Sequence, residues 1–190
     1  MGYTKLDNNK IIDELTNALE QNLESVEANA AVVVLLRIEN QEIQVLFVKR
    51  TEYPADTWSG QVALPGGKRE LGDRDLRETV VRETREETGI NLLEGCQFLG
   101  IMDPVRSVRK PEMKVLPFVV LQKEPQTINL NRELTEYFWE PLKEPDKHKR
   151  DVKLSFGEFT AYTVDGQVIW GLTFNILRNL LSLLEAINRE

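Results

Sequence analysis

The stretch from Trp58 to Ile90 limits the possible folds of this 190-residue chain more than any other segment. An apolar run ends there in Pro65, Gly66 and Gly67, and thirteen of the twenty residues that follow, Lys68 to Glu87, are charged. A segment so rich in charge must keep much of its surface in water, while two glycines bring bare backbone directly in front of it.

Capping signals predict a helix inside this segment. Asp75 with Glu78 three residues later has the spacing of a capping box, with Asp as the cap. Gly89 has the place of a C-terminal glycine, so we expect a helix from about Leu76 to Thr88.

Three acids of the expected helix lie on one face, because Glu83, Glu86 and Glu87 are spaced at i, i+3 and i+4. One interpretation is a solvated surface of salt bridges, since the segment holds seven acids and six bases. The other is a divalent cation site: like charges at i and i+4 repel, and hard cations take oxygen ligands that they share with substrate phosphates.

The residues Gly67 to Ile90 resemble the Nudix box, the glycine loop and helix of enzymes that hydrolyse nucleoside diphosphates linked to another group. The half from Arg82 to Gly89, Arg-Glu-x-x-Glu-Glu-x-Gly, is intact. Three features depart from the family pattern: Asp73 replaces a Glu, the spacer after it has one extra residue, and Thr84 replaces an aliphatic residue.

The extra spacer residue and Asp73 are also similar to the coenzyme A pyrophosphatase branch of that family. The branch has an upstream signature that ends in Gly, three residues and Phe-Pro-Gly-Gly. Here Gly60, Pro65, Gly66 and Gly67 are in register. In the same signature Leu64 replaces the Phe, Arg50 is close to the expected arginine, and Asp56 stands where a second arginine is usual; Trp170 and Gly171 resemble the end of the branch.

The resemblance implies an α/β fold, an α/β/α sandwich with a mixed sheet and a loop-helix-loop catalytic motif. It also implies Mg²⁺ or Mn²⁺ as cofactor, with Glu83, Glu86, Glu87 and the carbonyl oxygen of Gly67 as metal ligands. The general base is expected to be a carboxylate, either Glu86 or Glu133, because the one histidine, His148, lies in a charged stretch typical of a solvated loop. Arg82 is expected to hold a box glutamate, and Asp73 to orient it.

Substrate contacts are expected from Arg50, from Gly66 and Gly67, and from Arg106 and Arg109 in a basic loop of an otherwise acidic protein. An ordinary solvated loop is the alternative for the last two. Tyr53 and Trp58 could stack on a base or belong to the core.

Outside the box, periodicity predicts a mixed α/β domain. The expected helices are residues 9–23 and a long C-terminal helix with Phe174, Leu177, Leu181 and Leu184 on its apolar face. The expected strands are residues 30–38 and 43–49, joined as a hairpin, and 97–102, 115–121, 137–141 and 159–164. We expect one Nudix domain over residues 27–190, preceded by an amphipathic helical extension over residues 1–26.

Composition restricts the setting. A net charge of −7 disfavours nucleic acid as a partner, and the only cysteine, Cys96, is expected to be a small buried apolar residue. The longest apolar run has seven residues, against roughly 20 for a membrane span, and the first ten residues lack an apolar signal core. We therefore expect a cytoplasmic protein without a membrane or nucleic-acid partner. The family resemblance implies a small-molecule nucleotide as substrate, and we expect a monomer or homodimer.

Three function classes stay open. The first is a metal-dependent hydrolase of coenzyme A or acyl-CoA, with ADP-ribose, NADH, dinucleoside polyphosphates or modified nucleotides as other substrates. The second is a nucleotide-binding regulator without turnover, although the chain keeps all three box acids. The third is an interaction module that uses its terminal amphipathic helices.

Overall fold

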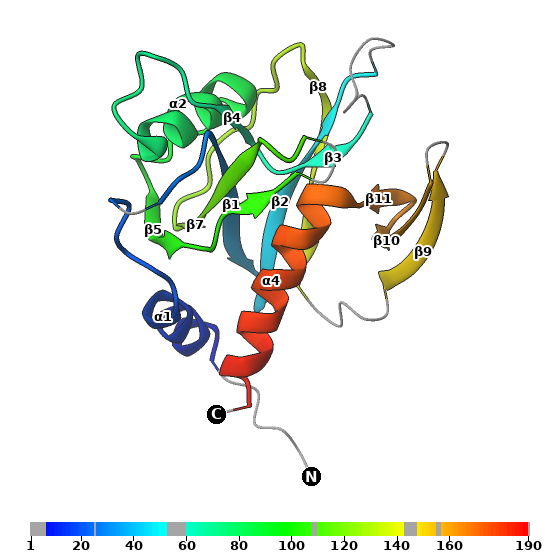
Figure 1. Cartoon of the computed structure of the whole chain (residues 1–190). Helices are drawn as coiled ribbons and strands as arrows, with labels where there is room; N and C mark the ends of the chain where they lie inside the picture. The colour runs from blue at the N-terminus through cyan, green and yellow to red at the C-terminus, as the bar shows by residue number, and fades with distance from the viewer. Residues whose placement is uncertain are drawn as a thin grey trace.

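A computed structural model describes residues 7–24, 26–52, 60–107, 110–142, 148–154 and 157–189. Within these ranges the chain forms three α-helices, one eight-stranded mixed sheet and one three-stranded sheet (Figure 1). The helices are α1 (Asn8–Ala18), α2 (Leu76–Thr88) and α4 (Gly171–Ile187).

The large sheet has the central strand order β3-β2-β1-β7-β5, and β4, β6 and β8 pair with β1, β7 and β2 respectively. Only the β1–β7 pair is parallel among the described ladders. The strands of this sheet are β1 (Ala30–Glu39), β2 (Glu42–Arg50), β3 (Val62–Ala63), β4 (Gly66–Lys68), β5 (Cys96–Ile101), β6 (Val105–Arg106), β7 (Lys114–Gln122) and β8 (Leu134–Pro141).

Both faces of the sheet are covered, and β1 shows how. Ala31, Val33 and Leu35 pack on the face that α2 covers, whereas Val34 and Leu36 pack on the opposite face, with α1 and α4. Successive side chains of a strand point to opposite faces, so an almost continuous apolar run serves two cores at once. The result is three layers, α/β/α.

The smaller sheet has the order β11-β10-β9 and lies beside the N-terminal end of α4 in Figure 1. Its strands are β9 (Lys149–Leu154), β10 (Gly157–Val164) and β11 (Gln167–Ile169). Phe159 on β10 packs on Trp170, directly before α4, with ring centroids 5.4 Å apart. This contact ties the small sheet to the start of the last helix.

Local predictions are confirmed. The hairpin of β1 and β2 turns at Asn40 and Gln41, both with positive φ, as a two-residue hairpin loop requires. The helix from Leu76 to Thr88 has the expected bounds, and α4 buries the expected Phe174, Leu177, Leu181 and Leu184.

The helix expected over residues 9–23 is too long. It ends at Ala18, because Leu19 is extended and Glu20 forms an antiparallel bridge with Ile101 of β5. The side-chain nitrogen of Gln21, Nε2, donates to the Leu99 carbonyl oxygen at 2.8 Å and holds the chain in this path. Leu19 is buried at helical spacing, yet it reaches the core from extended backbone.

Two other expectations need correction. Cys96 is only partly buried, and its Sγ accepts from Gln126 Nε2 at 3.6 Å. His148 lies directly before β9 and is partly buried, with Nδ1 3.3 Å from the Thr163 carbonyl oxygen, so it is not a fully solvated loop residue.

Candidate active site

The site begins with the caps that fix α2. The Asp75 carboxylate accepts from the Glu78 amide at 2.8 Å, and Gly89 closes the helix with φ of 77°. Such caps satisfy backbone groups that the helix itself leaves unpaired. The two caps therefore fix where α2 begins and ends, and with that the helical spacing of its acids.

Strand β4 brings bare backbone against α2. Its residues Gly66 and Gly67 pair with Val32 and Ala31 of β1, and a Cβ atom at Gly66 would collide with the Ala31 carbonyl oxygen. A Cβ atom at Gly67 would collide with the Glu83 carboxylate. Both glycines are needed because backbone approaches from the sheet side and carboxylate from the helix side.

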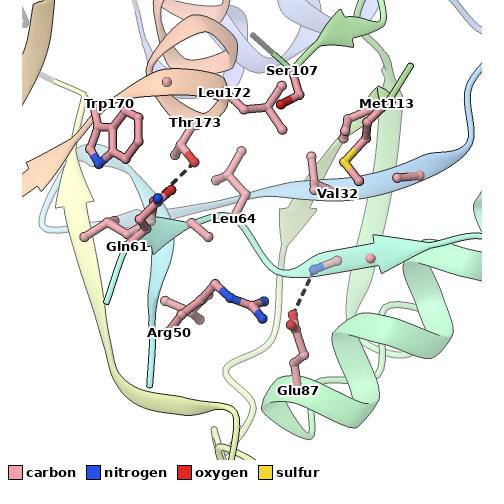
Figure 2. A pocket seen from close by; sticks show the side chains of 18 of the residues that line it. Val32, Arg50, Gln61, Leu64, Glu87, Ser107, Met113, Trp170, Leu172 and Thr173 are labelled. Carbon is pink, nitrogen blue, oxygen red and sulfur yellow. Dashed lines mark hydrogen bonds between the residues drawn. The ribbon is translucent and has the colours of Figure 1, made fainter. Parts of the chain in front are cut away.

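Glu87 is the most deeply placed acid of the helix. Its Oε2 accepts from the Gly66 amide at 2.9 Å, and the residue is 6% exposed (Figure 2). Burial raises the pKa of Glu87 to about 7, and the charges of Glu83 and Glu133 also raise it, while the Gly66 amide and Arg50 lower it. Burial likewise raises the pKa of Glu83, against the effect of Arg82.

Arg82 and Asp73 form a second, contrasting group. Arg82 donates Nε and Nη2 to the two carboxylate oxygens of Asp73, both at 3.0 Å, and Asp73 also accepts from Thr79 Oγ1 and the Glu70 amide at 2.9 Å. The hydrogen bond from Arg82 holds the pKa of Asp73 well below its usual range. Asp73 and Arg82 thus hold each other in place, and the orienting role expected for Asp73 stays a prediction.

Arg82 also reaches the acids of its own helix. Its Nη1 lies 3.0 Å from Glu83 Oε1 and 3.2 Å from Glu86 Oε2. The expected salt bridge to a box glutamate is therefore present. Glu86 itself is exposed and stands outside the group formed by Glu83, Glu87 and the glycine strand.

The other candidate base, Glu133, is exposed and precedes β8. Its charge raises the pKa of Glu87, and the Asn131 amide, two residues earlier, donates to the Glu87 carbonyl oxygen at 3.0 Å, so Glu133 lies near the C-terminal end of α2. In the part of the chain that the structure describes, no group of three or more His, Cys, Asp or Glu side chains is arranged as a metal site.

The chemistry of the donors nevertheless fits a hard cation. Glu83 and Glu87 are two carboxylates with raised pKa. They lie against the bare backbone of Gly67 and Gly66 respectively. Carboxylate and carbonyl oxygens are the ligands that Mg²⁺ and Mn²⁺ take, and a cation would offset the burial of these charges. The roles assigned to individual ligands stay predictions.

A cavity of about 350 Å³ opens beside this group. Arg50, Gly66, Gly67 and Glu87 line it together, so the structure brings these predicted residues to one place (Figure 2). Further lining residues were not expected from the sequence, namely Ser107, Met113, Phe159, Leu172 and Thr173. Only Trp170 and Gly171, through the family resemblance, gave a signal for this wall.

The basic loop around residues 106–114 lines the cavity with Ser107 and Met113, and not with the expected Arg106. Arg106 is exposed, donates to the Pro111 carbonyl oxygen at 3.4 Å and is absent from the described cavity lining, where Ser107 and Met113 of the same loop are found. The predictions on Tyr53, Asp56, Trp58 and Arg109 lie outside the described residues.

The fold and the site together define a class of protein: an α/β/α enzyme in which a carboxylate-bearing helix faces a glycine strand at the mouth of a cavity. The chain belongs to the Nudix family, because residues 27–160 match the model of the NUDIX domain. The expected α/β/α sandwich with a mixed sheet is confirmed, and the protein is a pyrophosphohydrolase.

The chain is similar to two curated relatives over most of its length. It is 30% identical to the uncharacterized Nudix hydrolase NudL of Pectobacterium atrosepticum over 90% of this chain and 92% of that one. It is also 30% identical to the human mitochondrial coenzyme A diphosphatase NUDT8, over 83% and 70% of the two chains. These relatives confirm the resemblance to the coenzyme A branch.

A solved structure shows the same fold. The Ap4A hydrolase of C. elegans, in a binary complex, superposes with a TM-score of 0.55 and 18% identity over 84% of this chain and 96% of that one.

Proposed function

We propose that the protein hydrolyses the diphosphate linkage of coenzyme A or of an acyl-CoA, with Mg²⁺ or Mn²⁺ as cofactor. One observation carries this proposal: Glu87, Glu83, Gly66 and Gly67 form a compact group at the mouth of a cavity that Arg50 also lines. Diphosphate hydrolysis needs anion-binding groups and closely placed carboxylates in one such place.

The printed names of two relatives support the choice of substrate. The human relative is called a coenzyme A diphosphatase. A relative from Caenorhabditis elegans, 31% identical over 61% of this chain and 50% of that one, is called a peroxisomal coenzyme A diphosphatase. The residues Pro65-Gly66-Gly67 behind Gly60 are the part of this sequence that matches the branch signature.

Nudix hydrolases generally use divalent metals. In this chain Glu83, Glu86, Glu87 and the carbonyl oxygen of Gly67 are the proposed ligands. The bound cation would neutralise phosphate oxygens and lower the pKa of a coordinated water.

The chain's own residues do the remaining work in this proposal. Glu133 or Glu86 accepts the proton of the attacking water, and the position of Glu133 near Glu87 favours the former. Arg50 balances charge on the diphosphate from the cavity wall. Arg82 is a positioning residue that holds Glu83, while Arg106 and Arg109 stay proposed contacts for an outlying part of the substrate.

Product analysis tests the proposal. The wild-type protein and Glu87→Gln are incubated with coenzyme A, ADP-ribose, NADH and diadenosine polyphosphates, with Mg²⁺ or Mn²⁺, and the products are identified by mass spectrometry. We expect 4′-phosphopantetheine and adenosine 3′,5′-bisphosphate from the wild type, and neither product with a chelator.

Two other results would change the proposal in different ways. Cleavage of a different panel member alone would keep the family chemistry and replace the substrate. Absence of cleavage of every member, with nucleotide binding retained, would contradict the proposed reaction and favour the regulator alternative.

The cellular setting is a separate proposal. No helix in the described ranges is long and apolar enough to cross a membrane, and the similar proteins include mitochondrial and peroxisomal forms. Cytoplasmic location, a monomeric or homodimeric state, and the division into residues 1–26 and 27–190 stay predictions. Helix α1 buries Ile11, Ile12 and Leu15 in the protein's own core, which disfavours that face of the helix as a partner surface.

A further inference from the structure

The cavity has two unlike ends. Among the described lining residues the charged ones are Arg50, Lys68 and Glu87. Figure 2 shows Arg50 and Glu87 on one side of Leu64, next to the glycine strand, and Leu172, Thr173 and Ser107 on the other side. Lys68 is the last residue of the glycine strand, where it pairs with Ala30 of β1. The proposed diphosphate site is at this charged end, because Glu87, Arg50 and the glycine strand are there.

The other end is apolar with a few neutral polar groups. Trp170, Leu172 and Met113 supply its walls, together with Val115 of β7 and with Val32 of β1, which pairs with Gly66 of the glycine strand. Thr173 Oγ1 donates to the Val62 carbonyl oxygen at 3.2 Å, and the Ser107 hydroxyl accepts from the Lys110 amide at 3.2 Å. We call this region, lined by Val32, Met113, Val115, Trp170, Leu172 and Thr173, the apolar chamber.

The two halves of coenzyme A differ in charge, and the apolar chamber favours an uncharged group. On one side of the diphosphate is adenosine with a further phosphate on its ribose, which carries charge. On the other side is pantetheine, an uncharged chain with two methyl groups, two amides and a thiol or thioester. A phosphate placed among apolar walls without a cation is costly, whereas uncharged amides need only neutral hydrogen-bonding groups.

We infer that the apolar chamber binds the pantetheine or acyl-pantetheine half of the substrate, and that Leu172 and Met113 are residues that determine this specificity. The inference rests on the proposed function, since it concerns the two halves of coenzyme A. The adenosine half with its additional phosphate then extends away from the chamber, towards solvent.

The size of the cavity limits it to one part of the substrate, and the lining residues decide which part. Its volume of about 350 Å³ is near the lower limit of pockets that enclose a drug-sized ligand, about 300–1,000 Å³. One half of a coenzyme A molecule fits such a space and both halves do not. A longer acyl chain would compete for the room beside Leu172 and Met113.

The test measures the two halves separately. Isothermal titration calorimetry with Mg²⁺ present gives the Kd of 4′-phosphopantetheine and of adenosine 3′,5′-bisphosphate for the wild type, Leu172→Trp and Met113→Trp. Each variant narrows the chamber from a different wall. We expect the Kd of 4′-phosphopantetheine to rise at least about tenfold in both, and that of adenosine 3′,5′-bisphosphate to change less than about twofold.

Leu183→Trp is the matched control. Leu183 is a partly buried leucine on the same helix that does not line the cavity, so its replacement leaves both Kd values unchanged. Unchanged binding of adenosine 3′,5′-bisphosphate to Leu172→Trp and Met113→Trp also shows that these variants are folded.

Every outcome decides something. Weaker binding of adenosine 3′,5′-bisphosphate alone would overturn the inference and place the nucleoside in the chamber. Equal effects on both ligands, or none on either, would overturn it too. If the wild type cleaves no coenzyme A while 4′-phosphopantetheine binds and responds to both substitutions, the proposed function fails and the chamber's preference for pantetheine stands.

Discussion

Asp73 and Glu87 are both buried acids of the segment Gly67 to Ile90, but their surroundings shift their pKa values in opposite directions. Asp73 receives two hydrogen bonds from Arg82, and its pKa falls. Glu87 receives one from the Gly66 amide, and burial raises its pKa to about 7. One acid is fully partnered by the protein, while the other leaves charge for something outside the chain to balance.

The difference separates two uses of the same chemistry. A buried carboxylate paired with arginine fixes geometry, because either charge alone would be costly. A buried carboxylate beside another carboxylate and a bare glycine is a cost that a cation can offset. We therefore expect Asp73 and its partner Arg82 to stabilise the fold, and Glu87 with Glu83 to bind the proposed cation.

The largest effect that this comparison predicts is on turnover. Glu87→Gln keeps an acceptor for the Gly66 amide but removes the charge, so we expect turnover to fall about 10³-fold, which corresponds to about 4 kcal/mol. Steady-state rates with the best substrate of the panel measure the loss. The control is Glu94→Gln, because Glu94 is an exposed acid in a loop. A loss of turnover below about tenfold in Glu87→Gln would contradict the role in turnover that the comparison with Asp73 assigns to Glu87.

Asp73→Ala is expected to act mainly on stability. It removes the partner of Arg82 and leaves that guanidinium partly buried, so we expect about 3 kcal/mol less free energy of unfolding at pH 7. Urea denaturation followed by circular dichroism measures it. Because the pKa of Asp73 is lowered in the fold, its contribution is complete above the unfolded pKa and disappears as pH falls below about 4; a wild-type advantage that persists at low pH would contradict the assignment.

The reverse sign is expected for Glu87. Its raised pKa means that the metal-free fold is penalised increasingly as pH rises from 4.5 to about 7, and constantly above that. Metal-free Glu87→Gln should therefore be more stable than wild type at pH 8, by about 3 kcal/mol, and nearly equal to it at pH 4.5. Denaturation curves with EDTA at several pH values test this, and a difference that does not vary with pH would refute it.

The smallest effect concerns Thr84, which stands in place of the family's aliphatic residue. The residue is fully buried, and its hydroxyl has no hydrogen-bond partner among the described residues. Thr84→Val keeps the shape and removes the unsatisfied group, so we expect about 1 kcal/mol more stability. Thermal denaturation measures the gain, and turnover should change less than about twofold. A lower melting temperature would show that the hydroxyl has a use in the fold.

Local signals explain what the sequence predicted well. The caps Asp75 and Gly89 lie within one turn of the helix they define, and Asn40-Gln41 is bounded by two strongly apolar strands. Short-range chemistry determines such elements. The three acids on α2 and the glycine pair were found for the same reason, since their spacing is contained in one segment.

Long-range packing explains what was missed. The strands β3, β4 and β6 have two or three residues and exist only because distant strands pair with them. The chamber walls at Met113 and Leu172 are ordinary apolar residues in the sequence and could not be distinguished from core residues. The overlong first helix has the same cause, because the bridge from Glu20 to Ile101 cannot be read from its own segment.

The parallel ladder of β1 and β7 has a consequence for how the enzyme is made. Val33 pairs with Phe118, far along the chain, and α2 packs on both strands. During synthesis the helix therefore emerges after β1 and β4 but before β7, and contacts between distant residues form slowly. The nascent chain thus completes the packing around α2 only after the residues of β7, Lys114–Gln122, have been made.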